Sequence, residues 1–225
     1  RLAKNNLWIP LLNTVKLAVG TCFVSIFYGG VFAFLLTRTD LAWKKYLSSV
    51  FIFPYIMPQW TLAVVWQNLF NSNAVTGTSN GLLASLFGIR MPIWWCQGLF
   101  PSVMVLGLHY AAFACILIGA IFRNMDANLE EAATILDTPR CKTMLRITLP
   151  VKPAILSTVL LVFGSAMGSY PVPHYLKFTT LSTKYVSMNS KYTGEASILA
   201  IIMMVFGVAI MLLNEVSLPS RKSYT

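Results

Sequence analysis

The residues best suited to a specific interaction lie in one polar stretch, Asn128–Pro150 (NLEEAATILDTPRCKTMLRITLP), between two long apolar runs. Asn128 followed by Glu131 forms a capping box, in which each side chain bonds a free backbone N–H of the first helical turn. The apolar side chains of this turn recur at the i, i+3, i+4 and i+7 positions of one helix face: Leu129, Ala132, Ala133 and Leu136. Two alanines in so narrow a stripe allow another surface to come close, so the stripe indicates a docking surface for a partner protein.

A second short helix is predicted directly after the first. Asp137 and Thr138 interrupt the pattern, and Pro139 suits the first position of a new helix. That helix is expected to end before Pro150. We therefore predict a helix–turn–helix loop over residues 124–152 that is rigid enough to transmit a push from a partner. An ordinary solvated loop is the alternative interpretation.

The motifs of several common catalytic centres are missing from the sequence. It contains no GxxxxGK[ST] phosphate loop, no GxSxG and no HExxH, and no carboxylate pair falls inside an apolar run. The four cysteines have no CxxC spacing. We therefore expect no catalytic residue, no metal site and no cofactor bound by this chain.

The composition requires a lipid environment. Hydrophobic residues make up 56% of the chain and charged residues 11%, and the mean hydropathy is +0.68. A soluble domain carries about 25% charged residues, so this chain cannot cover its surface with charge. The net charge of +10 could suggest nucleic acid, but loops on the cytoplasmic side of membrane proteins collect Lys and Arg. We expect no nucleic-acid partner.

Five stretches free of Asp, Glu, Lys and Arg are long enough to cross a bilayer, which takes about 20 residues. They are Leu17–Leu36, Tyr46–Phe70, Met91–Phe122, Pro153–Leu176 and Ala196–Asn214. Backbone amides in lipid must be satisfied within their own segment, so all five are expected to be helices. The predicted fold is an all-α integral membrane protein of five or more spans, forming one domain over residues 1–225.

The distribution of positive charge predicts the orientation. Three regions that alternate to the same side carry ten of the seventeen Lys and Arg residues: the link after the first span, the 124–152 loop with its flanks, and the C-terminal tail. That side is therefore expected to be cytoplasmic. On the other side, Asn80–Trp95 is expected to be an interfacial helix followed by an aromatic anchor of two tryptophans, and Pro171–Glu195 an external loop.

Several residues within the spans are candidates for a special role. Pro54 and Pro58 should kink or break the second span, either for packing or for a pathway. Gly164 and Gly168 form a small-xxx-small face that allows close helix packing. His109 is an ionisable residue in mid-span and so a functional candidate, although a structural hydrogen bond to a neighbouring helix is the preferred explanation. The residues predicted to line a substrate path are Tyr55, Trp60, His109, Tyr110 and His174.

The polar stretch resembles the Glu-Ala-Ala loop of the permeases of type I ABC importers. Glu131-Ala132-Ala133 is followed by three residues, Asp137, nine residues and Ile147-Thr148-Leu149-Pro150, which matches the spacing of the family pattern. Asp137 stands where the family usually has Gly, and Asp is among the few residues that tolerate the left-handed conformation. The resemblance implies that the following residues couple the chain to an ATPase: Glu130, Glu131, Ala132, Ala133, Leu136, Asp137, Pro139, Ile147, Leu149 and Pro150.

The resemblance also implies partners and a location. A permease of this kind lies in the bacterial plasma (inner) membrane, multi-pass, with its coupling loop and C-terminus cytoplasmic. It works with two copies of an ABC ATPase subunit that hold ATP and Mg, a second permease half, identical or different, and an extracytoplasmic substrate-binding protein.

The expected substrate follows from three loosely matching segments, FIFPYIMPQWTLAVVW, Gly81-Leu82-Leu83 and GSYPVPHYL, which look most like the ferric-iron group. Polyamine, phosphonate and sugar phosphate are the alternatives. Two other classes remain open, a self-contained secondary carrier or channel and a membrane-embedded receptor or assembly subunit. The absence of buried carboxylates and of an inverted repeat weighs against a carrier or channel.

Overall fold

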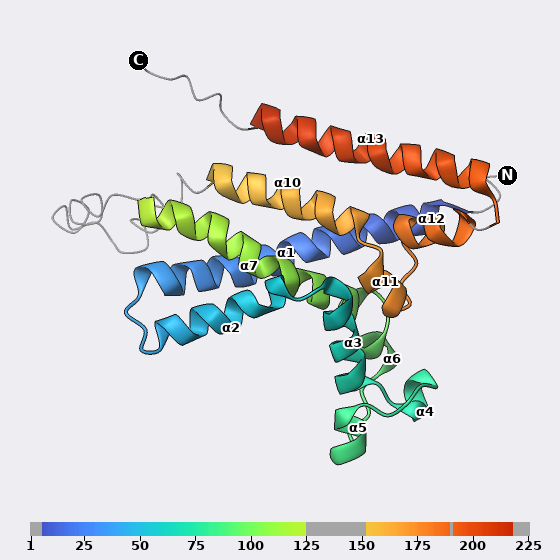
Figure 1. The fold of residues 1–225 in the computed structure, drawn as a ribbon, viewed down its shortest axis with the longest axis horizontal. Helices are drawn as coiled ribbons and strands as arrows, with labels where there is room; N and C mark the ends of the chain where they lie inside the picture. The colour runs from blue at the N-terminus through green and yellow to red at the C-terminus, as the bar shows by residue number, and fades with distance from the viewer. Residues whose placement is uncertain (1–5, 125–151, 190, 218–225) are drawn as a thin grey trace.

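The computed structural model describes residues 6–124, 152–189 and 191–217, and every regular element in these ranges is a helix (Figure 1). The longer helices are α1 (Trp8–Arg38), α2 (Lys44–Ile56), α3 (Gln59–Phe70), α7 (Leu99–Asn124), α10 (Lys152–Gly168), α12 (Leu181–Asn189) and α13 (Thr193–Ser217). The short ones are α4 (Asn73–Thr76), α5 (Leu82–Leu86), α6 (Ile93–Cys96) and α11 (Pro171–Tyr175). The predicted all-α fold class is confirmed.

Four helices form a bundle, and a lobe projects from its side. α1 packs most extensively on α7, and α10 lies between α1 and α13 (Figure 1). α3 leaves the bundle sideways and carries α4, α5 and α6 with it. The segment between α10 and α12, residues 169–180, lies at the end of the bundle where α1 begins. We call it the connector; it contains α11.

Within the described residues, three helices are long and apolar enough to cross a membrane: Trp8–Thr37, Ile93–Arg123 and Thr193–Val216. The apolar part of α10, Ile155–Gly168, is shorter. The predicted stretch Tyr46–Phe70 is two helices, α2 and α3, which meet at an angle of 103°. The break predicted from Pro54 and Pro58 is therefore present, and it falls where Met57 and Pro58 are both extended (ψ 142° and 141°).

Two further connections differ in detail from the expectation. The segment Asn80–Trp95, predicted as an interfacial helix followed by an aromatic anchor, contains two short helices, α5 and α6, and Gly88 between them has φ +64°. The segment Pro171–Glu195, predicted as an external loop, contains α11 and α12. Pro171 at the first helical position starts α11, and Leu181 and Met188 bury α12 against α13.

The close contact between α1 and α7 depends on glycines. A Cβ on Gly29 would lie 2.6 Å from the Ala111 carbonyl oxygen and 2.7 Å from Ala114 Cβ. A Cβ on Gly107 would lie 2.3 Å from Val24 Cγ1. Since the backbone at Ala111 cannot move aside cheaply, Gly29 fixes how closely the two helices approach. This approach sets the position of the middle of α7.

The outer face of α13 is apolar. Only 11% of its most apolar window is buried, and its exposed side chains include Ile201, Met204, Val205 and Met211. Such a surface in an apolar helix suits contact with hydrocarbon. The protein therefore presents at least one broad face to lipid.

Gly29→Ala and Gly30→Ala form a matched test of the α1–α7 contact. Gly29→Ala is expected to destabilise the protein by about 1–3 kcal/mol, because overpacking forces the helices apart. Gly30→Ala is expected to be neutral or slightly stabilising, because its added Cβ meets only Ile118 Cδ1 at 3.9 Å. Thermal unfolding of the purified protein in detergent measures both. Equal melting temperatures for the two variants would contradict this packing.

Candidate functional site at the break between α2 and α3

The break leaves one backbone acceptor without its helical donor. In an α-helix the carbonyl of Pro54 would accept from the N–H of residue 58, but Pro58 has no N–H. His109 of α7 takes over, since its Nδ1 lies 2.9 Å from the Pro54 carbonyl oxygen. A carbonyl oxygen can only accept, so the imidazole carries its hydrogen on Nδ1. His109, which is 8% exposed, thus satisfies the end of α2.

Tyr110, the residue after His109 on α7, bonds α3 on the other side of the break. Gln59, the first residue of α3, donates from Nε2 to the Tyr110 hydroxyl at 2.6 Å. Its Oε1 accepts from the Ser169 hydroxyl at 3.0 Å. Gln59 therefore joins α3 to both α7 and the connector. Sequence reasoning did not single it out, although its place directly after Pro58 was a usable signal.

The connector is bonded to several other elements. The Ser182 hydroxyl donates to the Ser169 carbonyl at 2.7 Å, and both side chains are buried. The remaining bonds of the connector reach α1, α3 and the residue before α7: Asn13 Nδ2 to the Thr179 carbonyl at 2.8 Å, Gln67 Nε2 to the Tyr175 carbonyl, and Gly98 N–H to the Leu176 carbonyl at 2.8 Å. Directly after the connector, the N–H of Leu181 in α12 donates to Thr14 Oγ1 of α1 at 2.9 Å. A displacement of the connector therefore reaches the break.

Three of the five predicted path residues lie together at this break. The Tyr55 ring lies 5.6 Å from the His109 ring, and the His109 ring lies 5.0 Å from the Tyr110 ring. Trp60, next to Gln59 on α3, is half exposed. His174 is on α11, where it is exposed and stacks on Tyr170. Tyr55 and Trp60 could meet a passing solute, and their role in a path stays a prediction.

The remaining predicted residues are placed differently. The coupling residues from Glu130 to Pro150 lie outside the described residues. A Cβ on Gly164 would meet Ile210 of α13 at 3.6 Å, an ordinary contact distance. A Cβ on Gly168 would meet nothing within 4 Å. Their part in helix packing stays a prediction.

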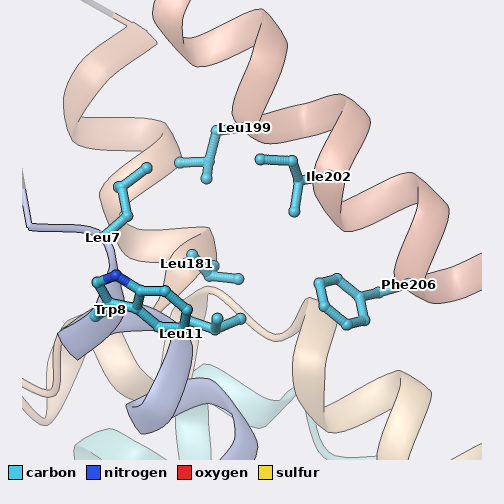
Figure 2. Close-up of a pocket in the computed structure, with 7 residues that line it drawn as sticks. All are labelled: Leu7, Trp8, Leu11, Leu181, Leu199, Ile202 and Phe206. Atoms are coloured by element: carbon cyan, nitrogen blue, oxygen red, sulfur yellow. The ribbon is translucent and has the colours of Figure 1, made fainter. Parts of the chain in front are cut away.

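An apolar pocket of about 300 Å³ lies at the same end of the bundle but between α1, α12 and α13 (Figure 2). Figure 2 shows its lining side chains, all apolar: Leu7, Trp8, Leu11, Leu181, Leu199, Ile202 and Phe206. The one polar group of these side chains is the indole N–H of Trp8, which is not enough to hold a charged solute, so this pocket is not the site sought here. The described residues also contain no group of three His, Cys, Asp or Glu side chains that could hold a metal ion.

This all-helical membrane protein with a broken second span belongs to a known class of permease. Residues 25–223 match the family of the binding-protein-dependent transport system inner membrane component. The chain therefore belongs to this family and is a permease subunit of an ABC importer. The resemblance found in the Glu-Ala-Ala loop is confirmed at the level of the family.

The relatives are named for the transport of different solutes. The chain is 30% identical to the molybdenum transport system permease protein ModB of Escherichia coli (strain K12), over 72% of this chain and 69% of ModB. It is 27% identical to a spermidine/putrescine transport system permease protein PotC homolog of Mycoplasma genitalium, over 99% of this chain and 75% of that protein. It is 26% identical to the putative ferric transport system permease protein FbpB 1 of Haemophilus influenzae, over 85% of this chain and 27% of FbpB 1.

Solved structures support the fold. An amino acid ABC transporter chain superimposes with a TM-score of 0.63 at 18% identity, over 95% of both chains. A chain of the MetNI methionine ABC transporter, in its inward-facing conformations, superimposes with a TM-score of 0.64 at 13% identity, over 92% of this chain and 94% of that one.

The two histidines provide a matched test of the bond that satisfies α2. His109→Leu is expected to destabilise the protein by about 1–3 kcal/mol, because it leaves the Pro54 carbonyl buried without a donor. His174→Leu removes an exposed ring and is expected to cost less than about 0.5 kcal/mol. Thermal unfolding in detergent measures both changes.

A second substitution checks the cause. Pro58→Ala restores an N–H at residue 58, so His109→Leu should cost less in that background than in the wild type. Equal costs of His109→Leu in both backgrounds would show that the bond to Pro54 is not what makes His109 necessary.

Proposed function

We propose that this chain is driven by a separate ABC ATPase that docks on the loop 124–152. The observation that carries the proposal is the spacing of Glu131-Ala132-Ala133, Asp137 and Ile147-Thr148-Leu149-Pro150, which falls inside the family match over residues 25–223. ATP and Mg belong to the partner, and this chain binds no cofactor of its own.

The partners and the orientation follow from the same proposal. Two ATPase copies bind the coupling loops of two permease halves, and an extracytoplasmic binding protein delivers the solute to the opposite side. The loop 124–152 and the C-terminus face the cytoplasm, supported by the ten basic residues on that side. The connector then lies at the external end.

The placement of the loop suggests how force would be transmitted. α7 ends at Asn124 and α10 begins at Lys152, so both helices that flank the loop are moved by anything bound to it. α7 carries His109 and Tyr110 to the break, and α10 leads directly to Ser169. A push on the loop would therefore reach Gln59 from both sides.

The proposed cargo is ferric iron. Its support is the likeness of three segments to that group, FIFPYIMPQWTLAVVW, Gly81-Leu82-Leu83 and GSYPVPHYL, and the relation to FbpB 1. Polyamine, phosphonate and sugar phosphate are the competitors, and the relation to ModB adds molybdate.

An uptake panel distinguishes these cargoes. The whole complex with its binding protein, in proteoliposomes, is expected to accumulate radiolabelled ferric iron, and more than about tenfold less molybdate, putrescine or phosphonate. Preferred uptake of any competitor would replace ferric iron as the cargo.

The coupling role is tested by substitutions in the loop. Glu131→Ala and Ala133→Trp are expected to lower solute-stimulated ATP hydrolysis and uptake at least about tenfold, because they remove the cap and the close-approach face of the docking helix. Membrane insertion should be unchanged. Glu215→Ala, at the end of α13, is the control and should transport normally.

Three results would contradict the ATPase-driven mechanism. The first is normal uptake in both loop variants. The second is a purified complex without a nucleotide-binding subunit, and the third is solute flux through the permease alone; both of these would favour a self-contained channel or carrier.

A further inference from the structure

Gln59 is the one described side chain that bonds both α7 and the connector at the break. It sits between Tyr110 Oη, 2.6 Å from its Nε2, and Ser169 Oγ, 3.0 Å from its Oε1. The Tyr110–Gln59–Ser169 chain, which we call the clasp, extends through the Ser169 carbonyl to the Ser182 hydroxyl of α12. It therefore spans four parts of the molecule that are far apart in sequence.

The clasp and the His109 bond have different structural roles. His109 satisfies a carbonyl that would otherwise lack a donor in whichever direction α3 points. Gln59 is the first residue of α3, so its two bonds act on the direction of α3 relative to α2. Met57 and Pro58 are extended and lie outside both helices, so no helical hydrogen bond crosses the break to hold the angle of 103°.

We infer that Gln59 is a positioning residue of the transport cycle: the clasp sets the angle of the α2–α3 break, and its opening lets the connector and α3 move apart. The inference rests on the transport role of the chain. It does not depend on which solute is carried. Tyr110 and Ser169 hold Gln59 from α7 and from the end of α10, the two helices that flank the loop 124–152. A shift of either helix therefore strains one bond of the clasp.

The energies involved permit opening. A hydrogen bond between helices in a membrane protein changes stability by about 0.6 kcal/mol on average, which is about threefold in an equilibrium. Removing one bond of the clasp is therefore expected to raise the open population about threefold, and removing both about eightfold. Such a contact can hold a resting angle and still be broken in each cycle.

A distance measurement tests the angle without any solute. Spin labels at Ser49→Cys on α2 and Asn68→Cys on α3, both exposed positions, report the angle in the whole complex after the native cysteines are replaced. Gln59→Leu is expected to broaden the distance distribution, and Gln97→Leu, outside the clasp, to leave it unchanged. If Gln59→Leu does not assemble, Ser169→Ala removes one bond of the clasp, and Tyr110→Phe removes the other together with the Tyr110 hydrogen bond to Ser165. A distribution unchanged in all clasp variants overturns the inference.

A cross-link tests whether the clasp must open. In the cysteine-free background, Gln59→Cys with Ser169→Cys is joined by a short bifunctional methanethiosulfonate that dithiothreitol releases. Uptake is expected to fall at least about fivefold on cross-linking and to return on reduction. Unchanged uptake in the cross-linked complex overturns the inference. The wild-type complex is the reference for the proposed function: if it takes up no solute, the proposed function fails, and the distance result stands independently.

Discussion

The structure depends on one missing backbone donor. Pro58 has no N–H, so the Pro54 carbonyl loses its helical partner where α2 meets α3. An unsatisfied carbonyl in hydrocarbon costs several kcal/mol, and a break in a membrane helix persists only if another element supplies the donor. His109 does so from α7 at 2.9 Å. The break is therefore a joint property of α2 and α7, and α7 must be held at the right height and rotation.

The glycine contacts between α1 and α7 provide that precision. The Gly29 Cα faces the Ala111 carbonyl so closely that no Cβ fits, and Gly107 receives Val24. Both contacts are within a turn of His109 on α7, which places the imidazole and the next residue, Tyr110, on the two sides of the break. Small residues in α1 and α7 thus determine the geometry of a site to which α1 contributes no side chain.

The sequence predicts the presence of this break but not its shape. Runs free of charge locate the helices, because burying charge in lipid is costly, and Pro54 and Pro58 mark where the second run must be interrupted. The angle depends on Gln59, whose partners lie 51 and 110 residues away. No local pattern reports such pairings. The same limit explains the polar segment with α11 and α12: α12 is secured by distant contacts with α1 and α13, and α11 by contacts with α3 and α7.

The two bonds made by neighbouring residues of α7 differ in what their loss would cost. Without His109 a carbonyl acceptor in a membrane-buried break has no donor, so this bond has to persist while α3 changes direction. The groups of the clasp are hydroxyls and an amide, each of which can both donate and accept, so they can exchange hydrogen-bond partners when α3 changes direction. The first bond is therefore suited to keep the break intact and the second to regulate its angle. A helix interrupted by proline can in this way be both stable in lipid and movable.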